Sequence, residues 1–232
     1  MAKNHFYLCI HCGARNEALF RVFTKSALTL QTCDDCNMII DKYVEYDFTT
    51  IFIDILLLKL SAYRHVLYNS NTKSYLSRLV ALTLLSFSYV EWVHQKGKKE
   101  HRSEPIFYEL EWGYYLIIGQ EFIKAALFSL TFLLFGFISS KLIMQQELFS
   151  CKHMLHGMAM SYCWNLVTIP SLVWNHYSTY HVLSQIALLI SCNHTFHVCI
   201  CPSYMLSIIT IVCAWGVQWS AAHGLQRMHL FS

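Results

Sequence analysis

The sequence predicts a small N-terminal β-ribbon and an amphipathic helix, followed by an all-α polytopic membrane domain of four to five spans. Three observations lead to this fold class. Two Cys-x-x-Cys pairs stand near the N-terminus, a segment with a polar stripe on an otherwise apolar surface follows them, and no Asp, Glu, Lys or Arg occurs from His153 to Gln226. The predicted domains are a ribbon over residues 1–40, an interfacial segment over 41–75, a transmembrane helical domain over 76–222 and a short tail over 223–232.

The composition is that of a membrane protein. Hydrophobic residues make up 55% of the chain and charged residues 13%, whereas a soluble domain has about 25% charged residues. The net charge of +3 is too small to argue for nucleic acid, and no Lys/Arg-rich helix is apparent, so we expect no nucleic-acid partner. Residues 1–30 lack a continuous apolar core, so we expect no cleavable signal peptide there.

The paired cysteines predict a zinc ribbon. Cys9 and Cys12 form one Cys-x-x-Cys pair, and Cys33 and Cys36 form the second. Two intervening residues let one tight turn present both sulfurs to a single ion, and two such turns complete a tetrahedron around Zn²⁺. Gly13 suits a turn that needs positive φ. We expect about one structural zinc per chain, supplying much of the folding free energy of so small a core.

Two short strands are predicted between the pairs, over residues 19–23 and 28–30. Other uses of the cysteines remain open at this level. Two disulfides would need an oxidising compartment, a redox pair normally occurs once before a helix, and iron could replace zinc. Four thiolate ligands leave no open coordination position, so the predicted metal is structural and not catalytic.

The segment from Asp41 to Asn69 predicts an amphipathic helix in the membrane interface. Wound as one helix, Asp47, Asp54, Ser61 and His65 fall at spacings of seven, seven and four and form a narrow polar stripe. The rest of its surface is apolar, through Ile51, Phe52, Ile55, Leu56, Leu58 and Val66. Such a helix lies in the interface or packs against the helical bundle.

Several roles are open for this segment. Asp54 and His65 form a proton-handling pair or, more simply, Asp54 is solvated. Arg64 binds a lipid phosphate or only extends its charge to the interface. A sterol would use the apolar face around Ile51, Ile55 and Leu58. No Gly/Ser linker precedes the segment, which predicts that the ribbon docks directly on it.

Five stretches are candidate spans. They cover residues 76–93, 125–140, 155–174, 182–200 and 204–219, with Pro170 as a kink in the third and Pro202 between the last two. We begin the second span at Ala125, so that Lys124 lies at the membrane interface. Extended back to Gly113, it would instead bury Glu121 and Lys124 as an i,i+3 pair, which would be a functional-site candidate.

The sequence leaves open both the orientation of the chain in the membrane and the presence of a second metal site. Basic residues on both sides of the first span give conflicting signals for orientation. We place the ribbon in the cytosol because thiolates keep zinc more readily in a reducing compartment. His194 and His197 lie one turn apart near Cys192, Cys199 and Cys201, and either bind a metal or form hydrogen bonds between helices.

The N-terminal third resembles a known family. The stretches YLCIHCG, CDDC, DKYVEYD and AYRHVLYN, in this order and spacing, resemble the Arv family, whose name abbreviates acyl-CoA:cholesterol acyltransferase-related protein required for viability. The resemblance covers about residues 6–70. It implies that the four cysteines are zinc ligands. It also makes the following residues family-pattern positions of unassigned role: Asp41, Tyr43, Glu45, Asp54, Tyr63, Arg64, His65 and Asn69.

The resemblance implies a function in lipid homeostasis. Members of this family are multi-pass endoplasmic reticulum membrane proteins implicated in sterol and sphingolipid distribution and in glycosylphosphatidylinositol anchor synthesis. Two expectations follow: a mediator of lipid trafficking with membrane lipids as partners, or an accessory subunit of a membrane glycosyltransferase complex. A lipid-modifying enzyme is a weaker alternative, because the sequence has no phosphate loop, nucleophile elbow or open metal site. Asp54, Tyr63, Arg64, His65 and Asn69 are the expected lipid or partner contacts.

Overall fold

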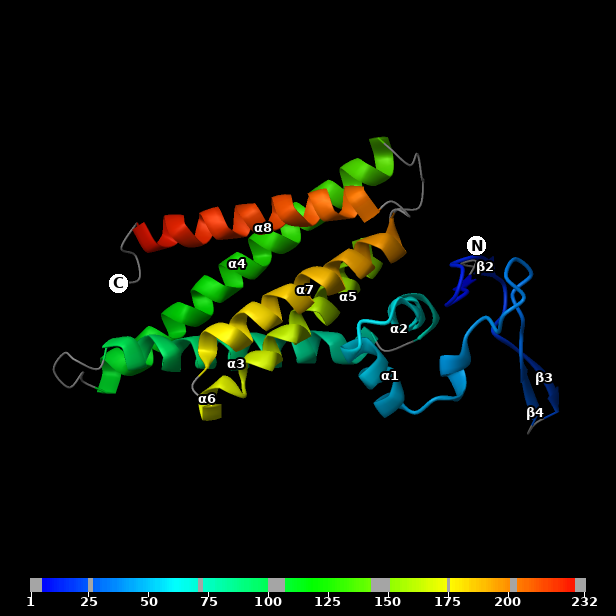
Figure 1. The fold of residues 1–232 in the computed structure, drawn as a ribbon, viewed down its shortest axis with the longest axis horizontal. Coiled ribbons are helices and arrows are strands. Elements are labelled where there is room, and N and C mark those ends of the chain that lie inside the picture. The colour runs from blue at the N-terminus through cyan, green and yellow to red at the C-terminus, as the bar shows by residue number, and fades with distance from the viewer. Residues whose placement is uncertain are drawn as a thin grey trace. The chain divides into compact units, whose positions relative to one another are not determined.

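The computed structural model describes residues 6–24, 27–70, 73–99, 107–142, 151–174, 176–200 and 204–227 (Figure 1). The chain divides into two compact units, Met1–Lys73 and Ser74–Ser232. The first unit contains every strand among the described residues, together with short helices, and the second is helical. A small N-terminal β region followed by a helical chain is the coarse architecture that the sequence predicts.

The strands of the first unit form two antiparallel pairs. They are β1 (Tyr7–Leu8), β2 (Arg15–Asn16), β3 (Phe20–Thr24) and β4 (Ala27–Leu30). Tyr7 pairs with Asn16, and Phe20 pairs with Leu30. The β3–β4 hairpin confirms the two strands predicted between the cysteine pairs (Figure 1). The β1–β2 pair was not predicted, because strands of two residues are too short to leave an alternating pattern.

The expected single amphipathic helix is wrong. A 3₁₀ turn, η1 (Lys42–Glu45), leads into α1 (Phe48–Leu56), and then the chain restarts as α2 (Leu60–Arg64) and a π-turn, η2 (His65–Asn69). Leu58 has a φ of 54°, in the left-handed region that interrupts a right-handed helix. The four polar residues from Asp47 to His65 therefore do not share one continuous helix.

The core of the first unit is small and consists of two clusters. One contains Cys9, Leu19, Cys33 and Ile40. The other contains Ile10, Tyr43 and Ala62, against which Ile51 and Ile55 of α1 pack. Because cysteines supply half of the first cluster, a metal bound to them would act at the centre of this core.

The second unit is built from helices. They are α3 (Lys73–Lys99), α4 (Phe107–Leu142), α5 (Cys151–Tyr162), the 3₁₀ turn η3 (Cys163–Thr168), α6 (Ser171–Trp174), α7 (Tyr177–Cys199) and α8 (Tyr204–Arg227). Helix α4 packs against α8, and α5 packs against α7 (Figure 1).

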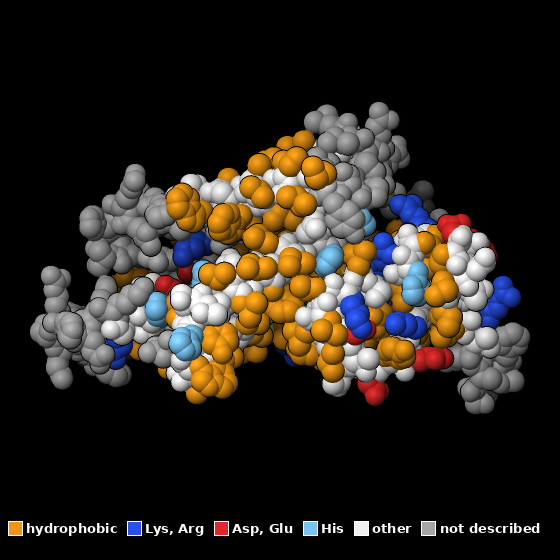
Figure 2. Space-filling model, in the orientation of Figure 1, with side chains coloured by type: hydrophobic (Ala, Val, Ile, Leu, Met, Phe, Trp, Pro, Cys, Tyr) orange, Lys and Arg blue, Asp and Glu red, His pale blue; other side chains and the backbone are white. Residues whose placement is uncertain are grey.

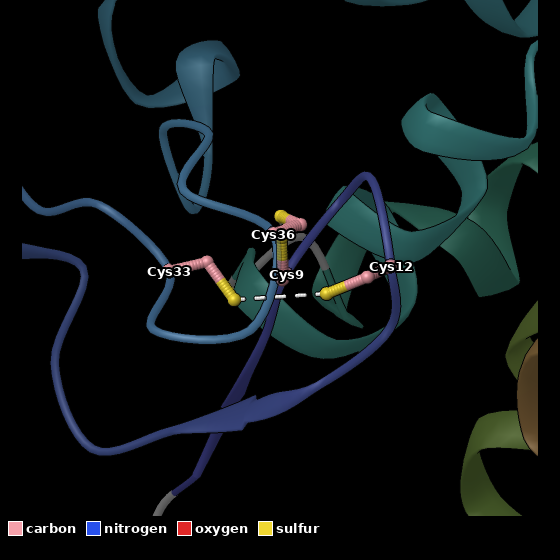
Figure 3. Close-up of side chains that lie close together, drawn as sticks. All are labelled: Cys9, Cys12, Cys33 and Cys36. Atoms are coloured by element: carbon pink, nitrogen blue, oxygen red, sulfur yellow. Dashed lines mark hydrogen bonds between the residues drawn. The ribbon is translucent and has the colours of Figure 1, made fainter.

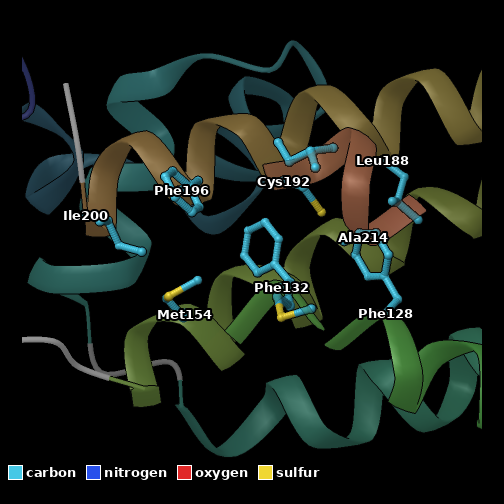
Figure 4. Packing of buried hydrophobic residues seen from close by; sticks show 10 residues of the cluster. Phe128, Phe132, Met154, Leu188, Cys192, Phe196, Ile200 and Ala214 are labelled. Atoms are coloured by element: carbon cyan, nitrogen blue, oxygen red, sulfur yellow. The ribbon is translucent and has the colours of Figure 1, made fainter. Parts of the chain in front are cut away.

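The core of this unit lies where α4, α5, α7 and α8 meet (Figure 4). Phe132 is fully buried and meets Phe196 edge to face, with their ring centroids 5.8 Å apart. At the α5–α7 contact, a Cβ placed on Gly157 would lie only 2.1 Å from Cγ2 of Thr195. Glycine is therefore required there for the two helices to approach so closely.

The number of spans differs from the prediction. Among the described residues, two helical stretches are long and apolar enough to cross a bilayer, Trp112–Lys141 and Tyr177–Cys199. The stretch expected at residues 155–174 is broken, since α5 ends at Tyr162 and a 3₁₀ turn precedes Pro170. In α8 only Ser207–Ser220 is continuously apolar, which is short of the roughly 20 residues that a span needs. Helix α3 carries Arg78, Glu91 and several hydroxyl side chains along its length.

The favoured limits of the second span are also wrong. Helix α4 is continuous through the stretch where a boundary was placed, and its candidate span begins at Trp112 and not at Ala125. Glu121 and Lys124 therefore lie inside that span, and their side chains are joined by an ion pair of 2.6 Å. This is the arrangement that the sequence offered as the alternative.

Candidate metal centre

The first Cys-x-x-Cys pair sits on a tight turn. The amide N–H of Gly13 donates to the Cys9 carbonyl at 3.0 Å, and that of Cys9 donates to the Ala14 carbonyl at 2.9 Å. Gly13 has a φ of 82°, a conformation that L side chains rarely adopt. The amide of Ala14 donates to Sγ of Cys12 at 3.4 Å. The glycine thus allows the turn that directs both sulfurs to the same side.

The second pair sits on a similar turn that uses asparagine in place of glycine. The amide of Asn37 donates to the Cys33 carbonyl at 2.9 Å, and the amide of Cys33 donates to the Met38 carbonyl at 2.8 Å. Asn37 has a φ of 55°, and asparagine is one of the few residues with a side chain that enter this region often. This use of Asn37 was not predicted from the sequence.

The two turns bring all four sulfurs together (Figure 3). The Sγ atoms of Cys9, Cys12, Cys33 and Cys36 all lie within 4.8 Å of one another. Sγ of Cys9 is 3.7 Å from that of Cys36, and Sγ of Cys12 is 3.6 Å from that of Cys33. A tetrahedral ion with metal–sulfur bonds of about 2.3 Å requires sulfurs about 3.8 Å apart. The donor set and its spacing therefore fit a tetrahedral thiolate metal.

The same distances argue against the other uses of these cysteines. The four are free thiols, and their separations are far from the roughly 2.05 Å of a disulfide bond. Among the residues that the structure describes, this is the one group of three or more Cys, His, Asp or Glu side chains that converges tightly enough for a metal. The alternative site at Cys192, His194, His197 and Cys199 does not converge in this way, and Cys201 lies outside the described residues.

Burial and local hydrogen bonds shift the pKa values of Cys9, Cys12 and Cys33 in different directions. Burial raises the pKa of Cys33, but hydrogen bonds from the backbone of Cys36 and Asp35 outweigh burial and lower that pKa to about 7. Burial raises the pKa of Cys12 to about 12 and also raises the pKa of Cys9. Metal binding requires thiolates, so it must release the protons that Cys9 and Cys12 hold at neutral pH.

Arg64 supports the first cysteine turn. Its Nη1 donates to the carbonyl of His11 at 2.6 Å and to that of Ile10 at 3.1 Å. A Cβ on Gly13 would lie 3.6 Å from Cζ of Arg64. The guanidinium group therefore lies against the turn and supports it.

Asn69 holds the strand that leads into the same turn. Its Oδ1 accepts from the amide of Leu8 at 2.9 Å, and its Nδ2 donates to the Leu8 carbonyl at 2.8 Å and to Oδ2 of Asp41 at 2.7 Å. The amide of Ile10 donates to the Ile40 carbonyl at 2.9 Å. These contacts confirm that the ribbon docks directly on the following segment.

A buried polar network continues from Asn69. Asp41 is fully buried, and its Oδ2 lies 2.6 Å from Nδ1 of His65. Its Oδ1 accepts from the amide of Tyr43 at 2.9 Å. The Tyr43 hydroxyl donates to Oδ2 of Asp54 at 2.8 Å. None of these residues is among the described side chains that have a buried polar atom without a partner, and satisfied polar groups are the condition under which a buried network stabilises a fold.

The proton-handling pair of Asp54 and His65, one of the two roles that the sequence left open, is not formed. Asp54 instead accepts from Tyr43 and from Nζ of Lys59 at 2.7 Å, while His65 contacts Asp41. The hydrogen bonds from Lys59 and Tyr43 lower the pKa of Asp54, so its carboxylate is ionised at neutral pH. The contact between Lys59 and Asp54 was not predicted because Lys59 lies five positions after Asp54, and five is not a helical contact spacing.

The expected lipid or partner contacts are therefore mostly internal. Tyr63 is fully buried, and Asp54 and His65 are each 7% exposed. The exposed surface of this unit is instead apolar along α1, where Phe48 is 70% exposed and Leu57, beside the helix end, is 61% exposed. Ile51 and Ile55, which the sequence offered to a sterol, pack inward.

The known proteins to which this chain is similar belong to one family. The model of the Arv1-like family matches residues 8–220. "Protein arv1 homolog" of Dictyostelium discoideum is 36% identical over 45% of this chain and 46% of its own length. "Protein ARV1" of Bos taurus is 24% identical over 96% of this chain and 79% of its own length. "Protein ARV1" of Candida albicans is 46% identical over 27% of this chain and 21% of its own length.

Several relatives are matched over only part of their length. The matched region spans 64% of the mouse protein and 63% of the human protein, both named "Protein ARV1". No solved structure matches the chain.

Proposed function

The chain belongs to the Arv1-like family, and from this premise we propose that it mediates the distribution and homeostasis of sterol and sphingolipid at the endoplasmic reticulum membrane. It acts without catalysing a reaction. Helices α4 and α7 anchor it in the bilayer, and the cysteine ribbon lies in the cytosol and binds one structural Zn²⁺.

The apolar face of α1 is the observation that carries this proposal. Phe48, Phe52, Ile53, Leu56 and Leu57 are between 44% and 70% exposed. A short helix with such a face lies in the boundary between headgroups and acyl chains, and each buried CH₂ group contributes about 0.8 kcal/mol to its binding. A surface of this kind touches membrane lipids directly and can loosen the packing around one of them.

The metal centre supplies rigidity to this face. Zn²⁺, when bound, holds the two cysteine turns together and contributes folding free energy. The first turn is attached to Arg64 and the adjoining strand to Asn69, and Asn69 in turn contacts Asp41. Asp41 and Tyr43 then connect to Asp54 on the inner side of α1. The ion thus fixes the orientation of the outer, apolar side of α1.

The helical unit offers an apolar hollow that supports the same function. It has a volume of about 300 Å³ and is lined by Leu85, Ser86, Tyr89, Val90, Ile169 and Leu172. This volume suits part of a sterol or an acyl chain. Its walls come from α3 and the α6 region.

The test is sterol transfer by the purified full-length protein. Donor vesicles carry a fluorescent sterol, and transfer to acceptor vesicles is compared with protein-free vesicles. We expect transfer by the wild type and loss of it in the Phe48→Ser/Phe52→Ser variant, with zinc content unchanged. Phe20→Ser is the matched control, since Phe20 is 40% exposed but lies on β3.

Failure of the wild type to move sterol above the protein-free rate would contradict the proposal. If the protein instead co-purifies in stoichiometric amount with subunits of a membrane glycosyltransferase, a role as accessory subunit in glycosylphosphatidylinositol anchor synthesis is supported in place of lipid transfer.

A further inference from the structure

Three helices of the second unit bring ionisable side chains together. The cluster contains Glu91 and Gln95 of α3, Glu121 and Lys124 of α4, and Tyr177 and His181 of α7. Figure 2 shows basic, acidic and histidine side chains close together among hydrophobic ones over the helical unit. Neither the metal centre nor the face of α1 uses this cluster.

Hydrogen bonds define the geometry of the cluster. Oε1 of Glu91 accepts from Nε2 of Gln95 at 2.8 Å, and its Oε2 accepts from the Tyr177 hydroxyl. The Tyr177 ring stacks on His94, with centroids 3.9 Å apart, and lies 5.5 Å from the His181 ring. Glu91 also interacts electrostatically with Lys124 of α4, which is paired with Glu121 at 2.6 Å. The six side chains therefore form one electrostatic site.

The cluster lies in an apolar setting. Glu121 is the tenth residue of the candidate span Trp112–Lys141, about 14 Å along the helix from its start. Its own exposure is 8%, while the adjacent Phe122 and Ile123 are 61% and 39% exposed. Beside His181, Val182 and Leu183 are 56% and 52% exposed. Tyr177 and His181 are the first and fifth residues of the other candidate span, Tyr177–Cys199, so the cluster extends from the end of α7 to a point inside the span of α4. Ionisable groups inside a span are costly and mark functional sites.

The charges of the cluster do not balance. With the imidazoles neutral, two carboxylates and one ammonium leave a net charge of −1. Lys96, the next basic residue on α3 whose contacts are described, lies over the Trp92 ring, 5.5 Å from its centroid, and does not supply the missing cation. Each ionised carboxylate offers about four acceptor positions, of which the described contacts fill two on Glu91 and one on Glu121. Counted over the residues that the structure describes, the site therefore lacks one positive charge and several hydrogen-bond donors.

We propose that this cluster binds the protonated primary amine of a membrane amphiphile between α3, α4 and α7. Three N–H donors and one positive charge match what the site lacks. The faces of Tyr177 and His94 add aromatic surface beside the cation. The exposed side chains next to Glu121 and His181 receive the apolar chain. The inference requires α4 and α7 to lie in the bilayer but does not depend on the metal centre or on sterol transfer.

The test measures binding of radiolabelled hexadecylamine to the full-length protein in nonionic detergent, with protein-free micelles subtracted. Hexadecanol has the same chain without the charge, and butylamine has the charge without the chain. We expect hexadecylamine to bind at least about tenfold more tightly than hexadecanol, because the alcohol supplies neither the positive charge nor the three N–H donors of the ammonium group. Competition by butylamine at similar concentration would show that a soluble amine, and not a lipid, is the ligand and would overturn the proposal.

Variants separate recognition from folding. Glu91→Gln and Glu121→Gln should each weaken hexadecylamine binding by about tenfold, whereas Glu17→Gln, which removes an exposed carboxylate of the first unit, should not. Lys124→Met removes the internal ammonium and should strengthen binding, an effect that a damaged fold would not produce. Unchanged binding in both glutamate variants, or weaker binding in Lys124→Met, would overturn the proposal. Sterol transfer, measured on the same protein preparations, tests the proposed function independently of amine binding.

Discussion

The side chain of Asn69 pairs with both backbone groups of Leu8, accepting from its N–H at 2.9 Å and donating to its C=O at 2.8 Å. An asparagine amide carries one acceptor and two donors, so it can take the place of a neighbouring strand. Here it joins the π-turn at the end of the helical segment to the strand that precedes Cys9. The metal centre and the segment after it thus form a single structural unit.

Replacing Asn69 with Ala should destabilise this unit. The substitution leaves the Leu8 amide and carbonyl without the Asn69 side chain as partner, and it removes one of the contacts of Asp41, which keeps those with His65 and Tyr43. Each group left unpaired where water cannot reach costs about 1–3 kcal/mol. The measurement is the temperature at which the full-length protein in micelles releases zinc. We expect Asn69→Ala to release zinc at a lower temperature, and Thr49→Ala, an exposed change on α1, to leave this temperature unchanged. An unchanged temperature in Asn69→Ala would show that the strand is held by other contacts.

Arg64 should control how firmly the metal is held. Groups that fix the ligand loops typically change metal affinity by 10- to 100-fold, so Arg64→Met should raise the rate of zinc loss to a chelator by about tenfold. Protein abundance should fall together with zinc content, since the contact is structural. Arg21→Met, on the exposed face of β3, is the control. If Arg64→Met retains zinc normally but loses function, Arg64 acts directly at the membrane and not by supporting the metal centre.

Cys33→Ser should remove the metal and unfold both parts of the first unit. A serine hydroxyl is a poor zinc ligand, and Cys33 is also buried in the core at 1% exposure. We expect proteolytic cleavage in both the ribbon and the α1–η2 segment, with near-zero zinc by elemental analysis. Cys213→Ser changes an exposed cysteine of α8 and should retain zinc. Protection of the α1–η2 segment in Cys33→Ser would mean that it folds without the ribbon.

Asp54→Asn should destabilise the first unit by an amount that does not vary between pH 6 and 8. The pKa of Asp54 is lowered by hydrogen bonds from Lys59 and Tyr43, so its stabilising effect is present above the unfolded pKa of about 3.9 and is lost as pH falls below it. Over the tested range the carboxylate is ionised in both states. The measurement is the difference in zinc-release temperature between variant and wild type. A difference that disappears toward pH 6 would contradict this assignment.

Gly157→Ala should weaken the contact between α5 and α7. The new methyl group would meet Thr195 Cγ2 at 2.1 Å, and overpacking of this kind costs about 1–3 kcal/mol. Thermal unfolding in detergent should shift downward, and adding Thr195→Ala should recover part of the loss. Gly119→Ala is the control, because nothing lies within 4 Å of its added Cβ. Equal stability of the two single variants would show that the helices can separate without cost.

The sequence by itself determined the features that depend on local spacing. Cysteine pairs two residues apart allow one turn to present two sulfurs, and Gly13 fits the positive φ that this turn has. The long uncharged stretch from His153 to Gln226 identified α7 as a helix apolar enough to span a membrane, because hydrophobicity is a property of composition. The β3–β4 hairpin followed from two short apolar runs between the cysteines.

Only the tertiary structure decided where the segment after the ribbon turns and which groups its side chains meet. Leu58 breaks the helix in a conformation that its residue type does not predict, and every side chain beyond it then faces a different neighbour from that of a continuous helix. Arg64 and Asn69 bond to residues more than 50 positions earlier in the chain, and sequence periodicity carries no information about such partners. The depth of Glu121 and Lys124 also depended on how far α4 continues, because a charged pair can end a span or lie buried within one once its charges are paired.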